Sequence, residues 1–422
     1  MEALKVLAVA DPGSIHANRF VRLLQECGCE VRVFHCGSHY VLEEHVPDTT
    51  IYVDSPGLAP LGSVRLMVAR PVRTAYCRAM LPLGFLNHYG HGAWRVGRRA
   101  VRRALGQDDR PFAAPYNARA AELARVIGNW RPGLVMSLRM QNEGYTVDRA
   151  RQILEGRFTG PWVHYCWGTD IELFGKDPRY APRHEVAIRS ALSACDGLIA
   201  DTKRDLRQAP RFGFRGIVLG DIVATGGFDL DAVRRIRDSA PATRDVILVK
   251  GRQGDLVGRA ANVLHALRRV PEAARHRVCI LMASREMREA LAGEFRDLRC
   301  EVLPRLGYAD LLALFARTRA AVSASDVDGT PGFLIEAIAT GALPVHSDME
   351  SVRDWIREGE NGLLFPADNV SALAAQLKRA LTDDELVARA SVANWRIAQE
   401  RLDRARIRVQ VAEIVRRMAR PS

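Results

Sequence analysis

A short unit in the C-terminal third most constrains the fold of this 422-residue chain. An apolar run at 320–322 predicts the end of a buried strand, and a loop rich in Ser, Asp, Gly and Pro follows it. A helical pattern then begins near Gly332 or Phe333 and stops at Gly341, before a second short strand at 343–345. Such a unit aims the helix N-terminus at the carboxyl end of a sheet, where its partial positive charge suits a phosphate.

Two carboxylates flank this loop. Asp328 precedes the turn, and Glu336 follows eight residues later on the helix. Because one carboxylate can accept hydrogen bonds from two neighbouring hydroxyls, the pair could hold a sugar at each end of a diphosphate, as in a nucleotide sugar. The plainer interpretation makes Asp328 a loop or capping residue and Glu336 a solvated helix residue.

The stretch resembles the donor-binding signature of the retaining glycosyltransferases of family four, the glycosyl transferases group 1, which have the GT-B fold. That signature is an acid, seven residues and a Glu, then Gly-x-Pro-Val and Asn-Gly-Leu-Leu. This chain has these residues at Asp328, Glu336, Gly341, 344–345 and 361–364, with two residues rather than one between Gly341 and Pro344. The resemblance implies that Asp328 contacts the transferred sugar and Glu336 the ribose hydroxyls.

Other donor contacts follow from the same resemblance. It implies that these residues line the donor site: Thr330, Gly332, Phe333, and Leu306 with Gly307 in the loop beside the nucleotide base. Two departures stand out, because the first acid is usually Glu and because Pro331 replaces a usual glycine, which removes a backbone donor.

The segment 326–328 also imitates the Asp-x-Asp metal motif of the other main glycosyltransferase fold. The helix of Glu336 and the Asn-Gly-Leu-Leu segment have no place in that motif, and two spaced aspartates are a weak metal signal. We therefore expect no metal and no cofactor besides the nucleotide diphosphate sugar as donor substrate.

Basic residues follow the strand predicted at 246–249. In the resembled family, a strand ending in Gly-Arg and a Lys about six residues on neutralise the diphosphate. Arg252 matches and is implied to be catalytic, but Gly258 stands at the Lys position, with Arg259 beside it. Arg259, or Lys250 as an alternative, would supply the second cation, although Arg and Lys are not equivalent there. The plainer interpretation is a set of solvated basic residues at a strand end.

The N-terminal segment predicts a second doubly wound unit, with a strand at 4–11, a loop, a helix and another strand. The loop lacks G-x-G-x-x-G, which argues against a dehydrogenase. The resemblance implies that Gly13 and Ser14 in this loop touch acceptor or donor phosphates. His16 is either an acceptor contact or a polar residue at a helix start.

Two further loops follow strands predicted in this half. After 134–138 come Gln141 and Tyr145, which are candidate acceptor contacts or caps of the next helix. After 163–166 comes Trp-Gly-Thr-Asp, which resembles the family's His-Gly-x-Asp segment. Trp167 replaces that histidine as an implied acceptor contact, and Asp170 is implied to be a catalytic carboxylate that orients the acceptor or contacts the sugar.

These patterns predict an α/β protein of the GT-B type, with two Rossmann-like doubly wound domains facing a central cleft. Residues 1–230 would form the acceptor domain and 245–395 the nucleotide-sugar domain. Residues 396–422 would form a C-terminal helix that crosses back onto the first domain.

Charge is concentrated in one region. The formal net charge is +12, and residues 65–110 contain ten Arg or Lys against two acids, a difference of 10 − 2 = +8. This region is either a helical excursion with a solvated basic face or a surface that lies on anionic lipid. With no recognised nucleic-acid-binding module, nucleic acid is not an expected partner.

The location follows from the same survey. No apolar run approaches the roughly 20 residues that cross a bilayer, and the chain begins with a strand pattern rather than a basic leader. We expect a cytoplasmic protein, with peripheral attachment to the inner face of the membrane left open by 65–110. The eight cysteines form no Cys-x-x-Cys pair, so buried thiols are expected.

The resemblance implies a retaining, metal-independent transfer of a sugar from a nucleotide diphosphate sugar to a hydroxyl of a glycan, a lipid-linked or a small-molecule acceptor. Two alternatives stay open at this point. One is a nucleotide-sugar epimerase of the same fold, and the other is a non-catalytic subunit that binds a nucleotide sugar or a membrane.

Overall fold

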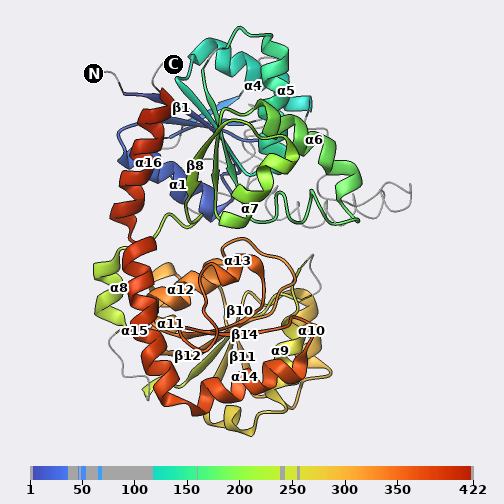
Figure 1. The fold of residues 1–422 in the computed structure, drawn as a ribbon, viewed down its shortest axis with the longest axis vertical. Helices are drawn as coiled ribbons and strands as arrows, with labels where there is room; N and C mark the ends of the chain where they lie inside the picture. Colours follow the sequence, from blue (N-terminus) through green and yellow to red (C-terminus); the bar gives the residue numbers. More distant parts are fainter. Residues whose placement is uncertain are drawn as a thin grey trace, which may run out of the picture. The chain divides into compact units, whose positions relative to one another are not determined.

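A computed structural model describes residues 3–36, 46, 49–53, 65–68, 117–158, 160–237, 243–253 and 257–419. The chain divides into two compact units (Figure 1). The first comprises Met1–Ala200, Leu206–Gly220 and Arg408–Ser422, and the second comprises Asp201–Asp205 and Asp221–Ile407. Most of the basic region 65–110 lies outside the described residues, so its surface stays a prediction.

The first unit is built on a sheet of eight strands among the described residues, in the order β4-β3-β2-β1-β5-β6-β7-β8. The strands are β1 Lys5–Val9, β2 Glu30–Phe34, β3 Thr50–Val53, β4 Arg65–Val68, β5 Leu134–Leu138, β6 Trp162–Cys166, β7 Gly197–Ala200 and β8 Ile217–Asp221. The registered pairs from β4 to β7 are all parallel. The order reverses between β1 and β5, and ligands of doubly wound sheets bind at such a switch point.

The helices that lie wholly or partly in this unit are α1 Ile15–Glu26, α4 Asn117–Trp130, α5 Tyr145–Leu154, α6 Ala181–Ala194, α7 Lys203–Gln208 and α16 Arg404–Ala419, with short turns η3 Met140–Gly144 and η4 Ala209–Phe212. The strands β5 and β6 are buried along their whole length. Strands covered on both faces need such near-continuous apolar runs, which is why the sequence made them easy to locate.

The second unit has a parallel sheet of six strands among its described residues, in the order β11-β10-β9-β12-β13-β14. They are β9 Val246–Lys250, β10 Arg277–Leu281, β11 Cys300–Val302, β12 Thr318–Ser323, β13 Leu343–Ser347 and β14 Leu363–Phe365. The helices are α8 Leu230–Ile236, α9 Ala260–Leu267, α10 Arg285–Ala292, α11 Tyr308–Arg317, α12 Gly332–Thr340, α13 Glu350–Arg353, α14 Val370–Thr382 and α15 Asp384–Arg401, with the turn η6 Pro271–Arg275.

Alternate side chains of β9 enter two separate cores. Ile247 and Val249 pack with apolar residues of α9 and α14 on one face, and Val246 and Leu248 pack with α11 and α12 on the other. The sheet is therefore covered on both faces, as doubly wound folds require. The unit predicted from the stretch around Asp328 is confirmed, because α12 ends at Gly341 in the left-handed region with φ +83°.

The helical pattern near the C-terminus is broken at 402–403, where α15 gives way to α16. The backbone of Phe228 causes the break, because its amide donates to Leu402 O at 2.8 Å and its carbonyl accepts from Arg404 N at 2.9 Å. Asp403 Oδ1 then accepts from Ala405 N at 2.9 Å, which begins the new helix. From Arg408 onward the chain belongs to the first unit.

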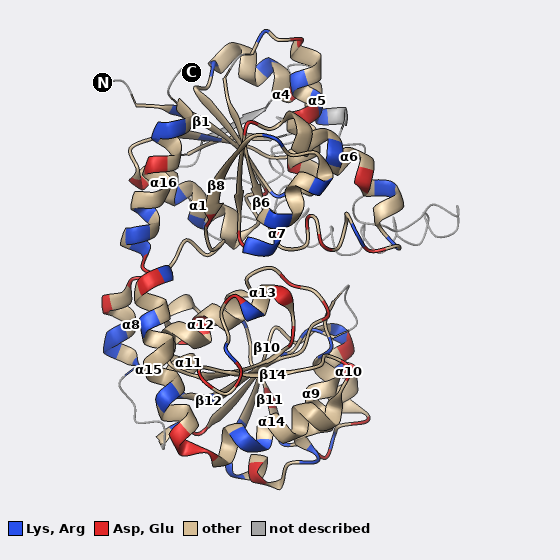
Figure 2. Ribbon diagram, viewed as in Figure 1, with Lys and Arg blue, Asp and Glu red and all other residues tan. Residues whose placement is uncertain are grey.

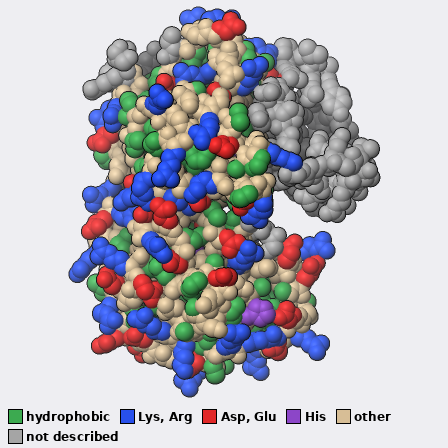
Figure 3. All heavy atoms as spheres, turned by 45° about the vertical axis from the view of Figure 1, so that its right-hand side comes forward, with side chains coloured by type: hydrophobic (Ala, Val, Ile, Leu, Met, Phe, Trp, Pro, Cys, Tyr) green, Lys and Arg blue, Asp and Glu red, His purple; other side chains and the backbone are tan. Residues whose placement is uncertain are grey.

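Charges of both signs are distributed over both units (Figures 2 and 3). Blue and red side chains alternate on the visible described surface rather than separating into fields of one sign. Among the described residues, no helix is both long and apolar enough to span a bilayer.

Candidate functional site

The carboxyl ends of β9, β12 and β13 bring three loops of the second unit together. In the parallel register, Val249 lies beside Val322, and Ser323 lies beside His346. The hydroxyl of Ser347 donates to Ser325 O at 2.7 Å and accepts from Ser325 N at 2.9 Å. These two hydrogen bonds fix the start of the loop that carries Asp328.

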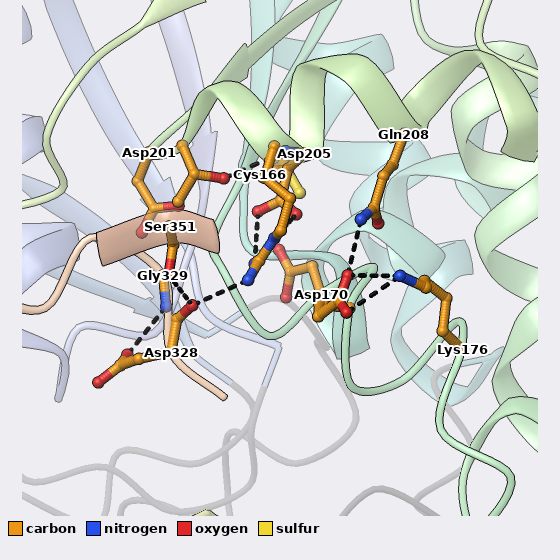
Figure 4. A network of polar contacts seen from close by, with 12 residues as sticks. Cys166, Asp170, Lys176, Asp201, Asp205, Gln208, Asp328, Gly329 and Ser351 are labelled. Atoms are coloured by element: carbon orange, nitrogen blue, oxygen red, sulfur yellow. Dashed lines mark hydrogen bonds and ion pairs between the residues drawn. The ribbon is translucent and has the colours of Figure 1, made fainter. Parts of the chain in front are cut away.

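Asp328 and Lys250 form an ion pair at this end of the sheet, with Nζ and Oδ2 2.8 Å apart. Asp328 Oδ1 accepts from Gly329 N at 2.9 Å, and Asp328 O accepts from Ser351 Oγ at 3.0 Å (Figure 4). Arg204, from the segment of this unit at 201–205, donates to the same carbonyl at 3.1 Å. The loop around Asp328 is thus held from three sides.

The electrostatics keep this carboxylate ionised. Burial raises the pKa of Asp328, but the charge and hydrogen bond of Lys250 outweigh burial, so the pKa lies below its usual value. Burial and the nearby Lys250 lower the pKa of His346 to about 4, so this histidine is neutral at pH 7. Its Nε2 has no hydrogen-bond partner within the described part of the chain. Sequence inspection missed His346, although it directly follows the Gly-x-Pro-Val match.

The predicted arginines lie on the neighbouring turn. Arg252 is exposed, and its carbonyl accepts from Ala260 N at 3.1 Å. Arg259 Nε donates to Asp326 Oδ1 at 3.0 Å, and its backbone amide donates to Ala324 O at 3.0 Å. The structure therefore brings Arg259 against the acidic loop, and Lys250, Arg252, Arg259 and Asp328 lie at one end of one sheet.

The N-terminus of α12 opens at the same place. Pro331 precedes it, and within the described residues no side chain caps the helix and no acid occupies its first turn. The amides of Gly332 and Phe333 therefore have no capping carboxylate to compete with a ligand. Glu336 is half-buried on this helix.

Other predicted donor contacts have structural partners. The ring of Phe333 is 4% exposed and lies 5.1 Å from that of Phe315, so only its backbone is available to a ligand. The hydroxyl of Thr330 donates to Asp201 O and accepts from Trp355 Nε1 at 3.3 Å. Leu306 is half-buried against the core, and Gly307 is exposed before α11.

In the first unit, the predicted residues surround the switch point between β1 and β5. Gly13 N donates to Asp11 Oδ1 at 2.9 Å, and Ser14 Oγ caps α1 by accepting from Ala17 N at 3.4 Å. His16 meets Trp167 edge to face, with ring centroids 6.1 Å apart. These two predicted acceptor contacts therefore lie together.

Asp170 joins the two loops that follow β5 and β6. It is fully buried, and its Oδ2 accepts from Met140 N at 3.0 Å and Trp167 N at 2.8 Å. Gln141 Nε2 donates to the carbonyl of Asp170 at 3.2 Å. The side chain of Tyr145 is also buried, and its hydroxyl lies 3.1 Å from His184 Nδ1. Asp170 and Gln141 are therefore near one another, and Tyr145 has a partner in the interior.

Sequence inspection missed the most perturbed residues of this loop. Arg139 and Asn142 have φ values of +93° and +73°, which non-glycine residues rarely adopt. Glu143 is 3% exposed and lies 3.7 Å from Arg139 Nε. Burial raises the pKa of Glu143 to about 8 despite the opposing charge of Arg139. A polar run after a largely apolar strand was the available signal, and strained, perturbed groups cluster at functional sites.

Two doubly wound units, with charged loops at the carboxyl ends of their sheets, define the GT-B architecture. Three solved structures share it over their whole length. Sucrose-phosphate synthase from Thermosynechococcus elongatus has a TM-score of 0.68 and 14% identity, covering 98% of this chain and 99% of that one. Anabaena HepE with UDP-glucose scores 0.65 at 15% identity, covering 98% and 100%. The UDP-forming α,α-trehalose-phosphate synthase from Burkholderia xenovorans scores 0.66 at 16% identity, covering 100% of both chains.

The family match lies where the resemblance was strongest. Residues 244–383 match the model of the family described as Glycosyl transferases group 1. The second unit therefore carries a match to this glycosyltransferase family, and the whole chain has the fold of the three solved structures. A search of curated proteins gave no match.

Proposed function

We propose that this protein transfers a sugar from a nucleotide diphosphate sugar to an acceptor hydroxyl, with retention of configuration and without a metal ion. The observation that carries the proposal is the pairing of Lys250 and Asp328 at 2.8 Å, in the loop that leads into α12. A carboxylate that can accept hydroxyl hydrogen bonds and groups that can bind phosphate then share one end of a parallel sheet. Anabaena HepE, solved with UDP-glucose, supports a nucleotide sugar as the donor.

The cations of this edge would stabilise the leaving group. Negative charge grows on the β-phosphate as its bond to the sugar breaks, and fixed positive groups lower the free energy of that transition state. Arg252, Arg259 and the first amides of α12 supply such groups. Lys250 takes the place of the family lysine, because this chain has Gly258 at the usual position.

Two of these cations are paired with carboxylates in the structure. Lys250 contacts Asp328, and Arg259 contacts Asp326. Donor binding would therefore redirect both cations toward the diphosphate and leave Asp328 to accept hydrogen bonds from the sugar. The departing phosphate would then take the acceptor's proton in a front-face attack, with Asp170 orienting the acceptor.

The acceptor is proposed as a glycan, a lipid-linked or a small-molecule alcohol. We also propose a cytoplasmic protein that attaches to anionic lipid through 65–110, which contain most of the excess positive charge. Binding to anionic liposomes that falls steeply with salt would support this attachment, and salt-independent binding or none would contradict it.

The main test substitutes residues of the proposed donor site. Arg252→Ala and Glu336→Ala should each abolish transfer in a folded protein, whereas Arg285→Ala, an exposed residue of α10, should not. A thermal-shift panel of UDP-, GDP- and ADP-sugars would identify the base, because a ligand at 100-fold its Kd stabilises by about 2.7 kcal/mol. Wild-type turnover in either site variant, or isomerised donor in the absence of acceptor, would overturn the proposal.

A further inference from the structure

Three potential metal ligands meet at the end of β6 in the first unit. His164, Cys166 and Asp170 each offer a ligand atom, and these atoms all lie within 4.8 Å of one another. His164 and Cys166 project to the same side of β6, because they are two residues apart on a strand. All three residues are 0% exposed. The proposed transfer reaction uses Asp170 of this cluster, but neither it nor the family match assigns a role to His164 or Cys166.

The imidazole of His164 is held in place from its far side. Its Nδ1 lies 2.8 Å from Ser137 Oγ, which also accepts from Trp162 Nε1 at 2.9 Å. Ligating histidines in proteins commonly use their second ring nitrogen in this way, and the bond fixes both the tautomer and the orientation of the ring. When Nδ1–H donates to Ser137, the lone pair of Nε2 faces away from Ser137.

That Nε2 atom is buried and has no hydrogen-bond partner among the described residues. An unsatisfied buried polar atom costs about 1–3 kcal/mol, so a native protein normally supplies a partner. A metal ion would be such a partner for a neutral imidazole.

We propose that His164, Cys166 and Asp170 bind one Zn²⁺ ion that stabilises the first unit. The donor set of nitrogen, sulfur and oxygen suits Zn²⁺ and excludes Mg²⁺ and Ca²⁺, which bind oxygen ligands. At Zn–ligand distances of about 2.0–2.3 Å, the ligand atoms come closer together than 4.8 Å, which small side-chain rotations achieve. Cys166 binds as a thiolate and releases its proton to solvent.

The position of the ion explains what it would do. Asp170 already accepts from Met140 N and Trp167 N, so an ion on Asp170 ties β6 to both loops at the switch point. One of these loops contains the strained residues Arg139 and Asn142. Strained backbone persists where its surroundings hold it, and the ion adds such a constraint. The ion is structural, and of its three ligands only Asp170 has a role in the proposed transfer.

The experiment measures metal directly in the full-length chain. Protein from zinc-supplemented growth, purified without a metal-affinity step, should contain about one Zn²⁺ per chain. Replacement with Co²⁺ should give the near-ultraviolet band of a thiolate–Co²⁺ bond. Cys166→Ser should lose both the band and most of the Zn²⁺, whereas Cys195→Ser, at another buried cysteine of the same unit, should keep both.

A measurement on the wild-type chain covers the case in which Cys166→Ser does not fold. Removing the ion with a strong chelator should lower Tm by several degrees, and adding Zn²⁺ back should restore it. Zn²⁺ well below one per chain together with no Co²⁺–thiolate band would overturn the proposal. So would an unchanged band in Cys166→Ser or an unchanged Tm after the ion is removed.

Discussion

The carboxyl ends of the two sheets carry charge in different ways. In the second unit, Lys250–Asp328 and Arg259–Asp326 are oppositely charged pairs on loops with partly exposed side chains. In the first unit, Glu143 and Asp170 are buried, and Glu143 lies beside Arg139 on a loop with strained backbone. The same topology therefore supports two kinds of charged site at the carboxyl ends of the strands.

The difference has a physical origin in how each loop is held. The loop of Asp328 is fixed by hydrogen bonds from Ser347 and Ser351, so its acid can remain partly exposed and exchange partners. The loop of Glu143 is fixed by a buried acid, Asp170, through the amide of Met140. Exposed pairs suit a charged ligand that arrives and leaves. Buried, strained groups suit a site whose geometry is set in advance.

The largest expected effect tests the ion pair between Lys250 and Asp328. Lys250→Met should lower kcat/KM for sugar transfer about 10²–10³-fold, because it removes a cation from a developing phosphate charge. Steady-state rates with a donor identified by thermal shift would measure this. Because the two side chains act as a pair, Lys250→Met with Asp328→Asn should lose less than the sum of the single losses.

Two outcomes separate this role from a merely structural one. Lys176→Met, which removes an exposed ion pair with Glu172 in the first unit, should leave kcat/KM unchanged. If Lys250→Met kept wild-type kcat/KM, the cation at this edge would not act on the donor, and the contrast between the two edges would fail.

The second effect concerns the buried carboxyl of Glu143 in the first unit and the pH dependence of stability. Glu143 has a folded-state pKa of about 8 against an ordinary value of 4.5, so the folded state holds a proton that the unfolded state has lost between these pH values. The free energy of unfolding therefore falls as pH rises from about 4.5 to about 8 and changes no further above that. The ionisable groups near Glu143 include Arg139, Asp11 and Asp170, and the thiol of Cys36, whose pKa is raised by burial.

Glu143→Gln should flatten this dependence, because the amide cannot ionise. Relative to wild type, the variant should gain on the order of 1–3 kcal/mol between pH 5 and pH 8, measured by urea unfolding at each pH. The exposed Glu155→Gln in the same unit should follow the wild-type curve. A Glu143→Gln curve parallel to wild type would mean that this carboxyl is ionised in the folded state.

The sequence predicted more of the charged site in the second unit than of the one in the first unit. Short-range patterns carry information on strands and on helix ends, which is why the strand–loop–helix–strand unit with its helix end at Gly341 was predicted and confirmed. The pairing of Lys250 with Asp328 spans 78 residues and depends on the register of β9 and β12, which no local pattern encodes. Likewise, burial of Glu143 depends on a loop conformation with positive φ at non-glycine residues, for which composition gives no signal.

A motif match also does not say what a residue does. Asn361 begins the Asn-Gly-Leu-Leu segment, yet its side chain is buried away from the charged edge in a network with Arg357, Trp355 and Asn394. Its Oδ1 accepts from Arg357 N at 2.7 Å, and its Nδ2 donates to Trp355 O at 2.9 Å and Asn394 Oδ1 at 2.8 Å. Asn394 lies on α15, so this residue attaches a loop to a helix.

The smallest expected effect on donor binding follows from that network. It tests whether the charged site of the second unit ends before Asn361. Asn361→Ala should lower the free energy of unfolding by about 1–3 kcal/mol, because it removes side-chain hydrogen bonds from the amide of Arg357, the carbonyl of Trp355 and Oδ1 of Asn394. KM for the donor should stay within about twofold, since Asn361 bonds to the carbonyl of Trp355, whereas the loop of Asp328 is contacted by the indole of Trp355 through Thr330. The exposed Asn129→Ala in the first unit should change neither quantity. A large rise in KM without loss of stability would place Asn361 in the donor site, which would then include residues next to β14.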